Sequence, residues 1–151
     1  MSESWKMPPM LKVFEAFGAL ADGRVRETGE GAAAVAASDG RKTYTVTWDA
    51  ATRTLSSNDN ASYWQGYAGY PALAYLMHRG LLPCEAQVAA IFAGIEWKAL
   101  NDRLRDHDKV IAHLEQERGL ELTAARAQAR AVLEALAALA PLKPAKRVRP
   151  V

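Results

Sequence analysis

The sequence predicts an α+β fold: one N-terminal helix, an antiparallel β-meander of three or four strands, and then a group of about four helices. Apolar residues recur every three or four positions before residue 22, and the period shortens to two between residues 24 and 57. The helical period returns after Pro71. The chain has 151 residues, 50% of them hydrophobic, which suits one domain with a core. We expect that domain over residues 1–142, with the first helix and meander in 1–60 and the helical part in 61–142.

The first helix is predicted from a proline pair and a regular apolar stripe. Pro8 and Pro9 suit the first turn of a helix, where a missing N–H costs little. Apolar residues then recur at helical spacing, at Met10, Val13, Phe14, Phe17 and Leu20. Asp22-Gly23 follows the stripe, so the helix should end there.

The meander is predicted from four short segments, RVRETG, AAAVAAS, KTYTVTW and RTLSS. They are separated by Gly29-Glu30-Gly31, Ser38-Asp39-Gly40 and residues 49–52, which have the glycine and aspartate content of hairpin turns. KTYTVTW is the clearest strand, because large and threonine side chains alternate along it. AAAVAAS is the weakest, because alanine is a poor strand former.

After Pro71 every segment has helical spacing. We expect helices from Pro71 to Gly80 and from Pro83 to Gly94, a longer one from Trp97 to near Gly119, and a last one from Leu122 to Leu139, before Pro141. The connection at Gly119 is short, so the last two helices should form an antiparallel pair.

Residues 56–71, SSNDNASYWQGYAGYP, form the most informative segment, which we call the aromatic loop. Its aromatic residues are Tyr63, Trp64, Tyr67 and Tyr70. They fit either a packed layer against the meander or an exposed platform that binds a base or a protein partner. The run from Ser62 to Gln65 fits a capping box at the start of a short helical turn.

The order of two strands, a polar turn, a loop and the helix PALAYLM resembles a SWIM-type zinc finger over residues 43–77. Such fingers place a C-x-C pair after the second strand and a C-x-H pair at the helix start. Here Ser57-Asn58-Asp59 and Gly69-Tyr70-Pro71 occupy those places, and of these only Asp59 has a ligand-type side chain. Zinc needs four donors, so we expect a metal-free relative without a cofactor. The resemblance implies nucleic-acid or protein binding.

Charge and composition favour a basic tail on a near-neutral body. The net charge is +2, but residues 143–151, KPAKRVRPV, hold four basic and no acidic residues, which leaves the body with 15 basic and 17 acidic ones. We expect an extended solvated arm or a disordered terminus there, because its prolines block a helix. No secretory signal or transmembrane segment is apparent, so we expect a cytoplasmic protein with no membrane partner. High alanine, arginine and glycine usage suggests a prokaryotic source.

No catalytic or metal-binding residue is predicted. Ser57, Asp59 and His78 lack the spacing of a catalytic triad, and no phosphate-binding loop is present. Cys84 is the only cysteine; its place near a predicted helix start could lower its pKa, whereas burial would make it inert.

The predicted function is a non-catalytic interaction module that binds nucleic acid or a protein partner. The predicted binding residues are Trp64, Tyr67 and Tyr70 for contact, Asn58 and Asp59 for shaping the loop, and Lys146, Arg147 and Arg149 for phosphate. One alternative is a structural protein that forms a homo-oligomer through helices 97–140. A second is a small-molecule-binding protein or enzyme with a pocket under the loop.

Overall fold

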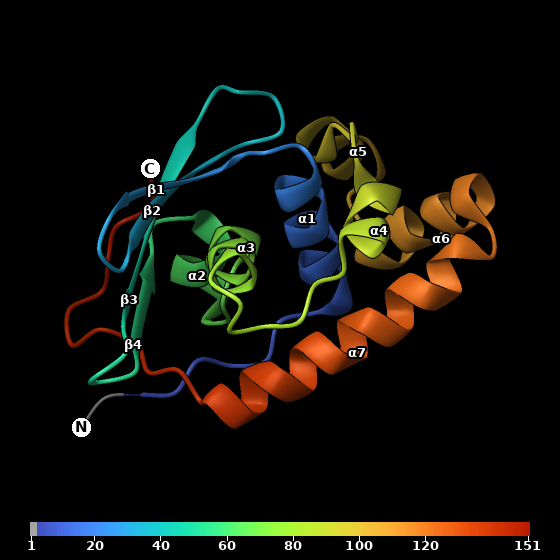
Figure 1. Ribbon diagram of the computed structural model, residues 1–151. Coiled ribbons are helices and arrows are strands. Elements are labelled where there is room, and N and C mark those ends of the chain that lie inside the picture. The colour runs from blue at the N-terminus through green and yellow to red at the C-terminus, as the bar shows by residue number, and fades with distance from the viewer. Residues whose placement is uncertain (1–2) are drawn as a thin grey trace.

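The computed structural model describes residues 3–151 and confirms the predicted α+β class, with a four-stranded sheet beside a group of helices (Figure 1). The elements are α1 (Met10–Ala21), β1 (Val25–Gly29), β2 (Ala32–Ala36), β3 (Thr43–Asp49), β4 (Thr54–Ser57), α2 (Asn60–Gln65), α3 (Tyr70–His78), α4 (Ala86–Ala89), the 3₁₀ turn η1 (Ala90–Phe92), α5 (Trp97–Leu104), α6 (His107–Arg118) and α7 (Glu121–Leu139).

The sheet is an antiparallel meander in the order β1-β2-β3-β4. The alanine-rich segment does form a strand, because its alternate residues Ala33 and Val35 are fully buried against the helices. Val46 and Leu55 continue the buried face on β3 and β4, while the threonines of β3 face solvent. Helix α3 packs against all four strands, so it is the element that joins the sheet to the helices.

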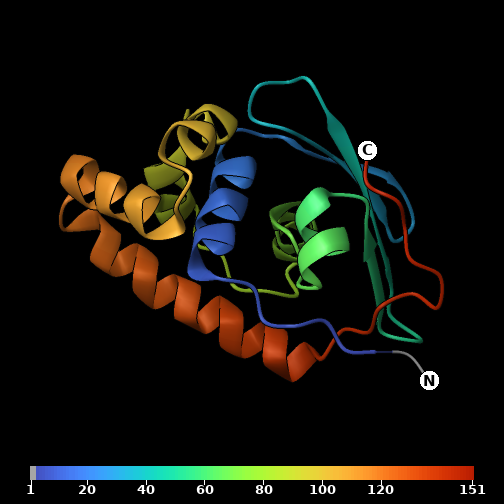
Figure 2. The ribbon, with the colours of Figure 1, turned by 180° about the vertical axis from the view of Figure 1, so that it is seen from behind.

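Helix α1 lies at the centre of the helical part, between the α2–α3 side and the α4–α7 side (Figure 2). It contacts α3, α4, η1 and α7. Phe14 and Phe17 are fully buried on it, and the Phe14 ring stacks on Phe92 of η1 with 4.8 Å between ring centroids. Aromatic stacking of this kind adds to the free energy gained from burial, so the first predicted helix is the core of the molecule.

The single long helix predicted from Trp97 to near Gly119 is wrong. Helix α5 ends at Leu104, and Arg105 adopts a left-handed backbone with φ of 54°. Asp106 then caps α6 by accepting hydrogen bonds from the backbone N–H groups of Asp108 and Lys109. An aspartate side chain that bonds to nearby N–H groups competes with a continuous helix, and the sequence periodicity does not show this break.

The helix predicted between Pro83 and Gly94 is also shorter than expected, because only α4 and η1 form there. Helix α7 follows α6 through a short turn and contacts α6, α4, η1 and α1. The apolar stripe of α7 is buried in these contacts, with Leu122, Ala125, Ala129, Val132 and Leu136 all at most 2% exposed.

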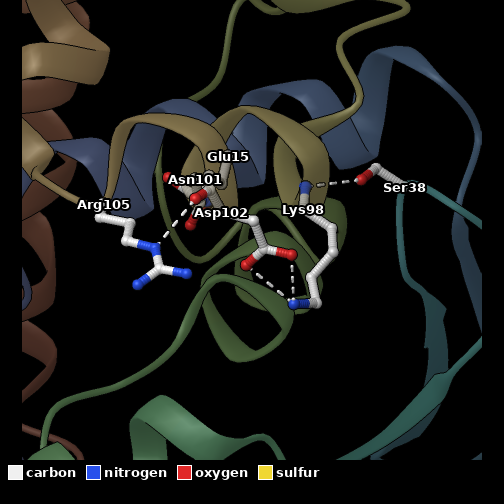
Figure 3. Close-up of polar contacts among 6 residues, drawn as sticks. All are labelled: Glu15, Ser38, Lys98, Asn101, Asp102 and Arg105. Carbon is white, nitrogen blue, oxygen red and sulfur yellow. Dashed lines mark hydrogen bonds and ion pairs between the residues drawn. The ribbon is translucent and has the colours of Figure 1, made fainter.

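A hydrogen bond between Asn101 of α5 and the buried Glu15 joins α5 to the central helix (Figure 3). Glu15 of α1 is only 2% exposed, and its carboxylate pairs with the Lys12 ammonium at 3.0 Å and accepts a 2.7 Å hydrogen bond from Asn101. Burial alone would lower the pKa of Lys12, but the Glu15 carboxylate raises it, and the net direction is upward. In α5, the backbone N–H of Lys98 donates a hydrogen bond to the hydroxyl of Ser38 in the β2–β3 turn, so α5 is fixed to both α1 and this turn of the sheet.

Within residues 3–151, no helix has the length and apolar character needed to cross a membrane.

Cys84 lies between α3 and α4, before the N-cap of α4, and is partly buried. Burial, with a smaller contribution from Glu85, raises the pKa of its thiol to about 11. The idea that a helix start lowers this pKa is therefore wrong. The thiol is expected to stay protonated near neutral pH, because a buried thiolate loses hydration.

We therefore predict that alkylation of Cys84 by iodoacetamide accelerates steadily up to about pH 10 without a plateau, because only the thiolate reacts. Mass spectrometry of timed samples gives the rate. A free cysteine derivative, which titrates near about 8.5, is the control. If the alkylation rate of the protein reaches a plateau at or below the pH at which the control is half ionised, the pKa of the Cys84 thiol is not raised.

Candidate functional site

The aromatic loop is organised around the buried carboxylate of Asp59, which is 5% exposed. Its Oδ1 accepts hydrogen bonds from the hydroxyl groups of Ser57 and Ser62, and its Oδ2 accepts one from the Ser62 backbone N–H at 3.0 Å. Ser62 Oγ in turn accepts a 3.0 Å bond from the Gly69 N–H. The cluster therefore joins the end of β4, the first turn of α2 and the start of α3.

The predicted capping box beginning at Ser62 is wrong by one turn. Asp59 is the N-cap of α2, and Ser62 is the residue whose N–H it caps. Both residue types cap helices well, so local sequence does not separate them. Asp59 is selected because Ser57 and Ser62 satisfy its remaining acceptor positions.

Gly69 packs directly on this cluster. A Cβ atom at residue 69 would lie 2.0 Å from Asp59 Oδ2 and 2.6 Å from Asp59 Cγ. The backbone of Gly69 has ordinary negative φ, so the requirement for glycine comes from space and not from conformation. The two ends of the aromatic loop therefore meet through Asp59 and Gly69.

Asn58 fixes the other side of the turn. Its side-chain oxygen accepts a 2.8 Å hydrogen bond from the Thr45 N–H, and its backbone N–H bonds to the Thr45 carbonyl. Its own carbonyl accepts a 3.0 Å bond from the Val151 N–H. Asn58 therefore extends the β3–β4 pairing and holds the end of the chain.

The hairpin, loop and helix that resemble a zinc finger are present as β3, β4 and α3. Among residues 3–151, no group of three or more histidine, cysteine, aspartate or glutamate side chains is placed to hold a metal ion. The family resemblance itself stays a prediction. His78 lies beside Glu27 of β1, and the hydrogen bond from Ser57 to Asp59 is direct, so this serine is not activated through that histidine.

The four aromatic side chains of the loop separate into two environments. Tyr70 meets Tyr44 edge to face at 6.1 Å between centroids, and burial raises its pKa. Tyr67 is also half-buried, and burial raises its pKa as well. These two tyrosines pack where the loop joins the rest of the fold. Their partial burial agrees with the packed layer that the sequence analysis gave as one alternative, and their predicted role as contact residues stays a prediction.

Tyr63 and Trp64 belong to the second environment, on the short helix α2. Trp64 is 69% exposed, which makes it one of the most exposed large apolar side chains described. The Tyr63 ring contacts the Trp64 ring edge to face at 4.7 Å, and it is covered by the guanidinium of Arg147 at 4.1 Å from its centroid. A tryptophan is usually highly buried, so the exposure of Trp64 requires an explanation.

The basic tail forms no helix, and it is neither the solvated arm nor the disordered terminus that the sequence analysis considered, because it packs along the fold. Just before it, Leu142 forms backbone hydrogen bonds with Arg53 and Leu55 beside β4. The N–H of Lys143 bonds to the Glu3 carbonyl at 2.7 Å, and Arg147 donates to the Tyr63 carbonyl. The two terminal segments thus run past each other beside β4, as both ribbon views show (Figures 1 and 2).

These segments and α2 enclose a cavity of about 400 Å³, which we call the terminal cavity. Its lining residues come from the N-terminal segment, the end of β4, α2 and the tail: Glu3, Trp5, Lys6, Ser57, Ser62, Tyr63, Trp64, Gln65, Gly66, Lys143, Pro144, Ala145, Arg147 and Val148. Three lining residues are basic and one is acidic. The cavity therefore combines aromatic surface with positive charge.

The lysines of the terminal cavity converge on Gly66. A Cβ atom there would lie 3.3 Å from Lys143 Nζ and 3.7 Å from Lys6 Cε. Lys143 Nζ also lies 5.4 Å from the centroid of the Trp5 ring and 3.4 Å from a carboxylate oxygen of Glu3. This cation is held above an indole but remains only loosely paired with an acid.

Of the predicted binding residues, the structure brings Trp64 and Arg147 together in the terminal cavity. Asp59 is hydrogen-bonded to the lining residues Ser57 and Ser62. The other predicted binding residues are not in the lining: Asn58, Tyr67, Tyr70, Lys146 and Arg149. Sequence reasoning missed Trp5 and Lys6, and it did not choose Lys143 from the basic tail as a binding residue. The only available signal was the Trp5-Lys6 pair, an aromatic and a cation side by side outside the apolar stripe of the first helix.

The chain belongs to the family whose model is described as "Uncharacterised conserved protein UCP014422", and the match covers residues 5–142. Searches of curated proteins and of solved structures found no significant match. The matched residues include Trp5, Lys6 and α2 but not the basic tail.

We predict that Gly69→Ala lowers the free energy of unfolding by about 1–3 kcal/mol, because the new methyl group collides with the Asp59 carboxylate. Gly29→Ala is the matched control: a Cβ atom at residue 29 would meet nothing within 4 Å. Chemical denaturation followed by circular dichroism gives both values. Equal stability of the two variants would contradict the packing described at Asp59.

Proposed function

We propose that this protein is a non-catalytic binding module for single-stranded nucleic acid, with the terminal cavity as its binding site. The observation that carries the proposal is the exposed Trp64 indole beside Lys6, Lys143 and Arg147 in one cavity. Proteins that bind single strands combine aromatic side chains on which bases stack with basic grooves that contact phosphate. Each stacked base contributes about 1–3 kcal/mol in such sites.

The charge distribution favours a nucleic acid over a protein partner. The body of the chain carries slightly more acidic than basic residues, yet the cavity holds three cations and one carboxylate. Positive charge is therefore concentrated where Trp64 is exposed. Aromatic and arginine side chains also anchor protein partners. The experiment below must therefore distinguish a nucleic-acid partner from an acidic protein partner.

The tail contributes to the site directly. Lys143 and Arg147 line the cavity, and Arg147 is positioned by its contacts with the ring and carbonyl of Tyr63. Removal of the tail would therefore take away two of the three cavity cations and part of the wall. The resemblance to SWIM-type fingers, whose members bind nucleic acids and proteins, supports the same class of function.

The alternative of self-association through helices 97–140 has less support. The apolar residues that suggested it, such as Leu100, Leu114 and Leu136, are at most 9% exposed and pack inside the protomer. Leu120, in the turn before α7, is 90% exposed but stands alone among those residues as an exposed large apolar side chain. A single exposed leucine is normal on a protein surface.

We predict that labelled single-stranded DNA or RNA binds at about 50 mM salt and that affinity falls as salt rises. Each phosphate contact on a single strand changes the logarithmic salt slope by about 0.7. Deletion of 143–151 should therefore flatten the slope by about 1.4, because Lys143 and Arg147 are lost from the cavity. Fluorescence anisotropy gives the affinities.

Two further proteins make this test specific. The double variant Lys143→Gln/Arg147→Gln should reproduce the slope change without deleting the tail, whereas Lys146→Gln/Arg149→Gln should change it less, because these two residues do not line the cavity. Absence of binding to any single or double strand at low salt would refute the proposal. Equal effects of the two double variants would place the contact on the tail as a whole and not in the cavity.

A further inference from the structure

We infer that the terminal cavity is a subsite for one nucleotide that carries a phosphate monoester, with its base on Trp64 and its phosphate among Lys6, Lys143 and Arg147. The ligand would be a free nucleotide or the phosphorylated end of a strand, since both present this chemistry. The inference rests on the proposed function and narrows it.

The size of the cavity limits the ligand to about one nucleotide. Its volume of about 400 Å³ is near the lower end of the range of about 300–1,000 Å³ that is typical of sites for one small molecule. Sites that follow a single strand extend over about 4–16 nucleotides per module. A site of this volume holds one base with its sugar and phosphate but not a run of nucleotides.

The number of free aromatic faces gives the same limit. The Tyr63 ring is covered by Arg147 at 4.1 Å, and the Trp5 ring faces Lys143 at 5.4 Å. Among the aromatic residues that line the cavity, Trp64 alone is largely exposed. Successive bases need successive platforms, so this arrangement supplies stacking for a single base.

The charge of the cavity fits a terminal phosphate better than an internal one. An internal phosphodiester carries one negative charge, whereas a phosphate monoester carries about 1.5 to 2 negative charges at neutral pH. Lys6 and Lys143 converge on Gly66, and Arg147 lines the same cavity from the tail. Two or three cations around one phosphate match the higher charge, and arginine adds a planar fork that suits phosphate oxygens.

The floor of the cavity distinguishes the two ends of the ligand. The hydroxyl protons of Ser57 and Ser62 are donated to Asp59, so both oxygens present lone pairs and no proton to the cavity. Ser62 Oγ also accepts from Gly69, which leaves Ser57 Oγ as the more available acceptor. A phosphate gains nothing from such a floor, whereas a ribose hydroxyl or a base amino group donates to it. The phosphate therefore belongs with the cations.

The test is isothermal titration of the full chain with adenosine, adenosine 5′-monophosphate, and an oligonucleotide of about 12 residues with and without a 5′-phosphate. We expect the monophosphate to bind at least about tenfold more tightly than adenosine, because only it reaches the cations. The affinity of the 5′-phosphorylated oligonucleotide should be within about threefold of that of the monophosphate, because one nucleotide already occupies the exposed indole and the cavity cations.

The outcomes separate this inference from the proposed function. If the phosphorylated oligonucleotide binds and the monophosphate does not, one nucleotide does not supply the contacts and the subsite is wrong, although single-strand binding remains. If affinity increases with length regardless of the 5′-phosphate, the one-nucleotide subsite is wrong although single-strand binding remains. If none of the four compounds binds, both are wrong.

Variants complete the test. Trp64→Ala and Arg147→Gln should each lower the affinity for the monophosphate by about tenfold or more. Lys146→Gln removes a charge outside the cavity and should change this affinity by less than about twofold. Thermal unfolding of each variant shows whether it is folded. Loss of binding in Lys146→Gln equal to that in Arg147→Gln would overturn the assignment of the phosphate to the cavity.

Discussion

The buried carboxylate of Asp59 is the interaction on which the rest of this region depends. It accepts hydrogen bonds from Ser57 and Ser62, caps α2, and packs against Gly69 at the start of α3. A buried carboxylate without such partners would be strongly destabilising. The strand β4, the short helix α2 and the start of α3 are therefore held together at this carboxylate, which orients the side chains of α2.

The exposure of Trp64 follows from this constraint. Helix α2 has six residues, and Ser62 is the one that the structure buries. Since Ser62 faces Asp59 and is buried, the Trp64 side chain two positions later points in a different direction from the helix and is 69% exposed. The terminal segments then close around α2, and Arg147 and Lys143 cover the rings of Tyr63 and Trp5. One indole is left uncovered beside the three cavity cations, which is the arrangement expected of a site for a base and its phosphate.

Local signals in the sequence were sufficient for much of the fold. The alternation in KTYTVTW and the glycine and proline breaks around α1 and α3 predict elements that the structure contains. The break at Arg105 was missed because a left-handed residue other than glycine leaves no periodic signature. The choice of Asp59 over Ser62 as the cap depends on the hydroxyl groups of Ser57 and Ser62 both turning toward the Asp59 carboxylate, which residue types alone do not show. The cavity likewise joins Lys6 to Lys143, which no local pattern connects.

The most direct test of the central claim uses the four tryptophan indole N–H signals in a ¹H–¹⁵N spectrum during titration with adenosine 5′-monophosphate. Trp5 and Trp64 line the terminal cavity, whereas Trp48 and Trp97 are 7% and 4% exposed in the core. The account predicts that the indole signals of Trp5 and Trp64 move with the bound fraction while those of Trp48 and Trp97 stay in place. A titration in which the Trp64 signal does not move at saturation would contradict it.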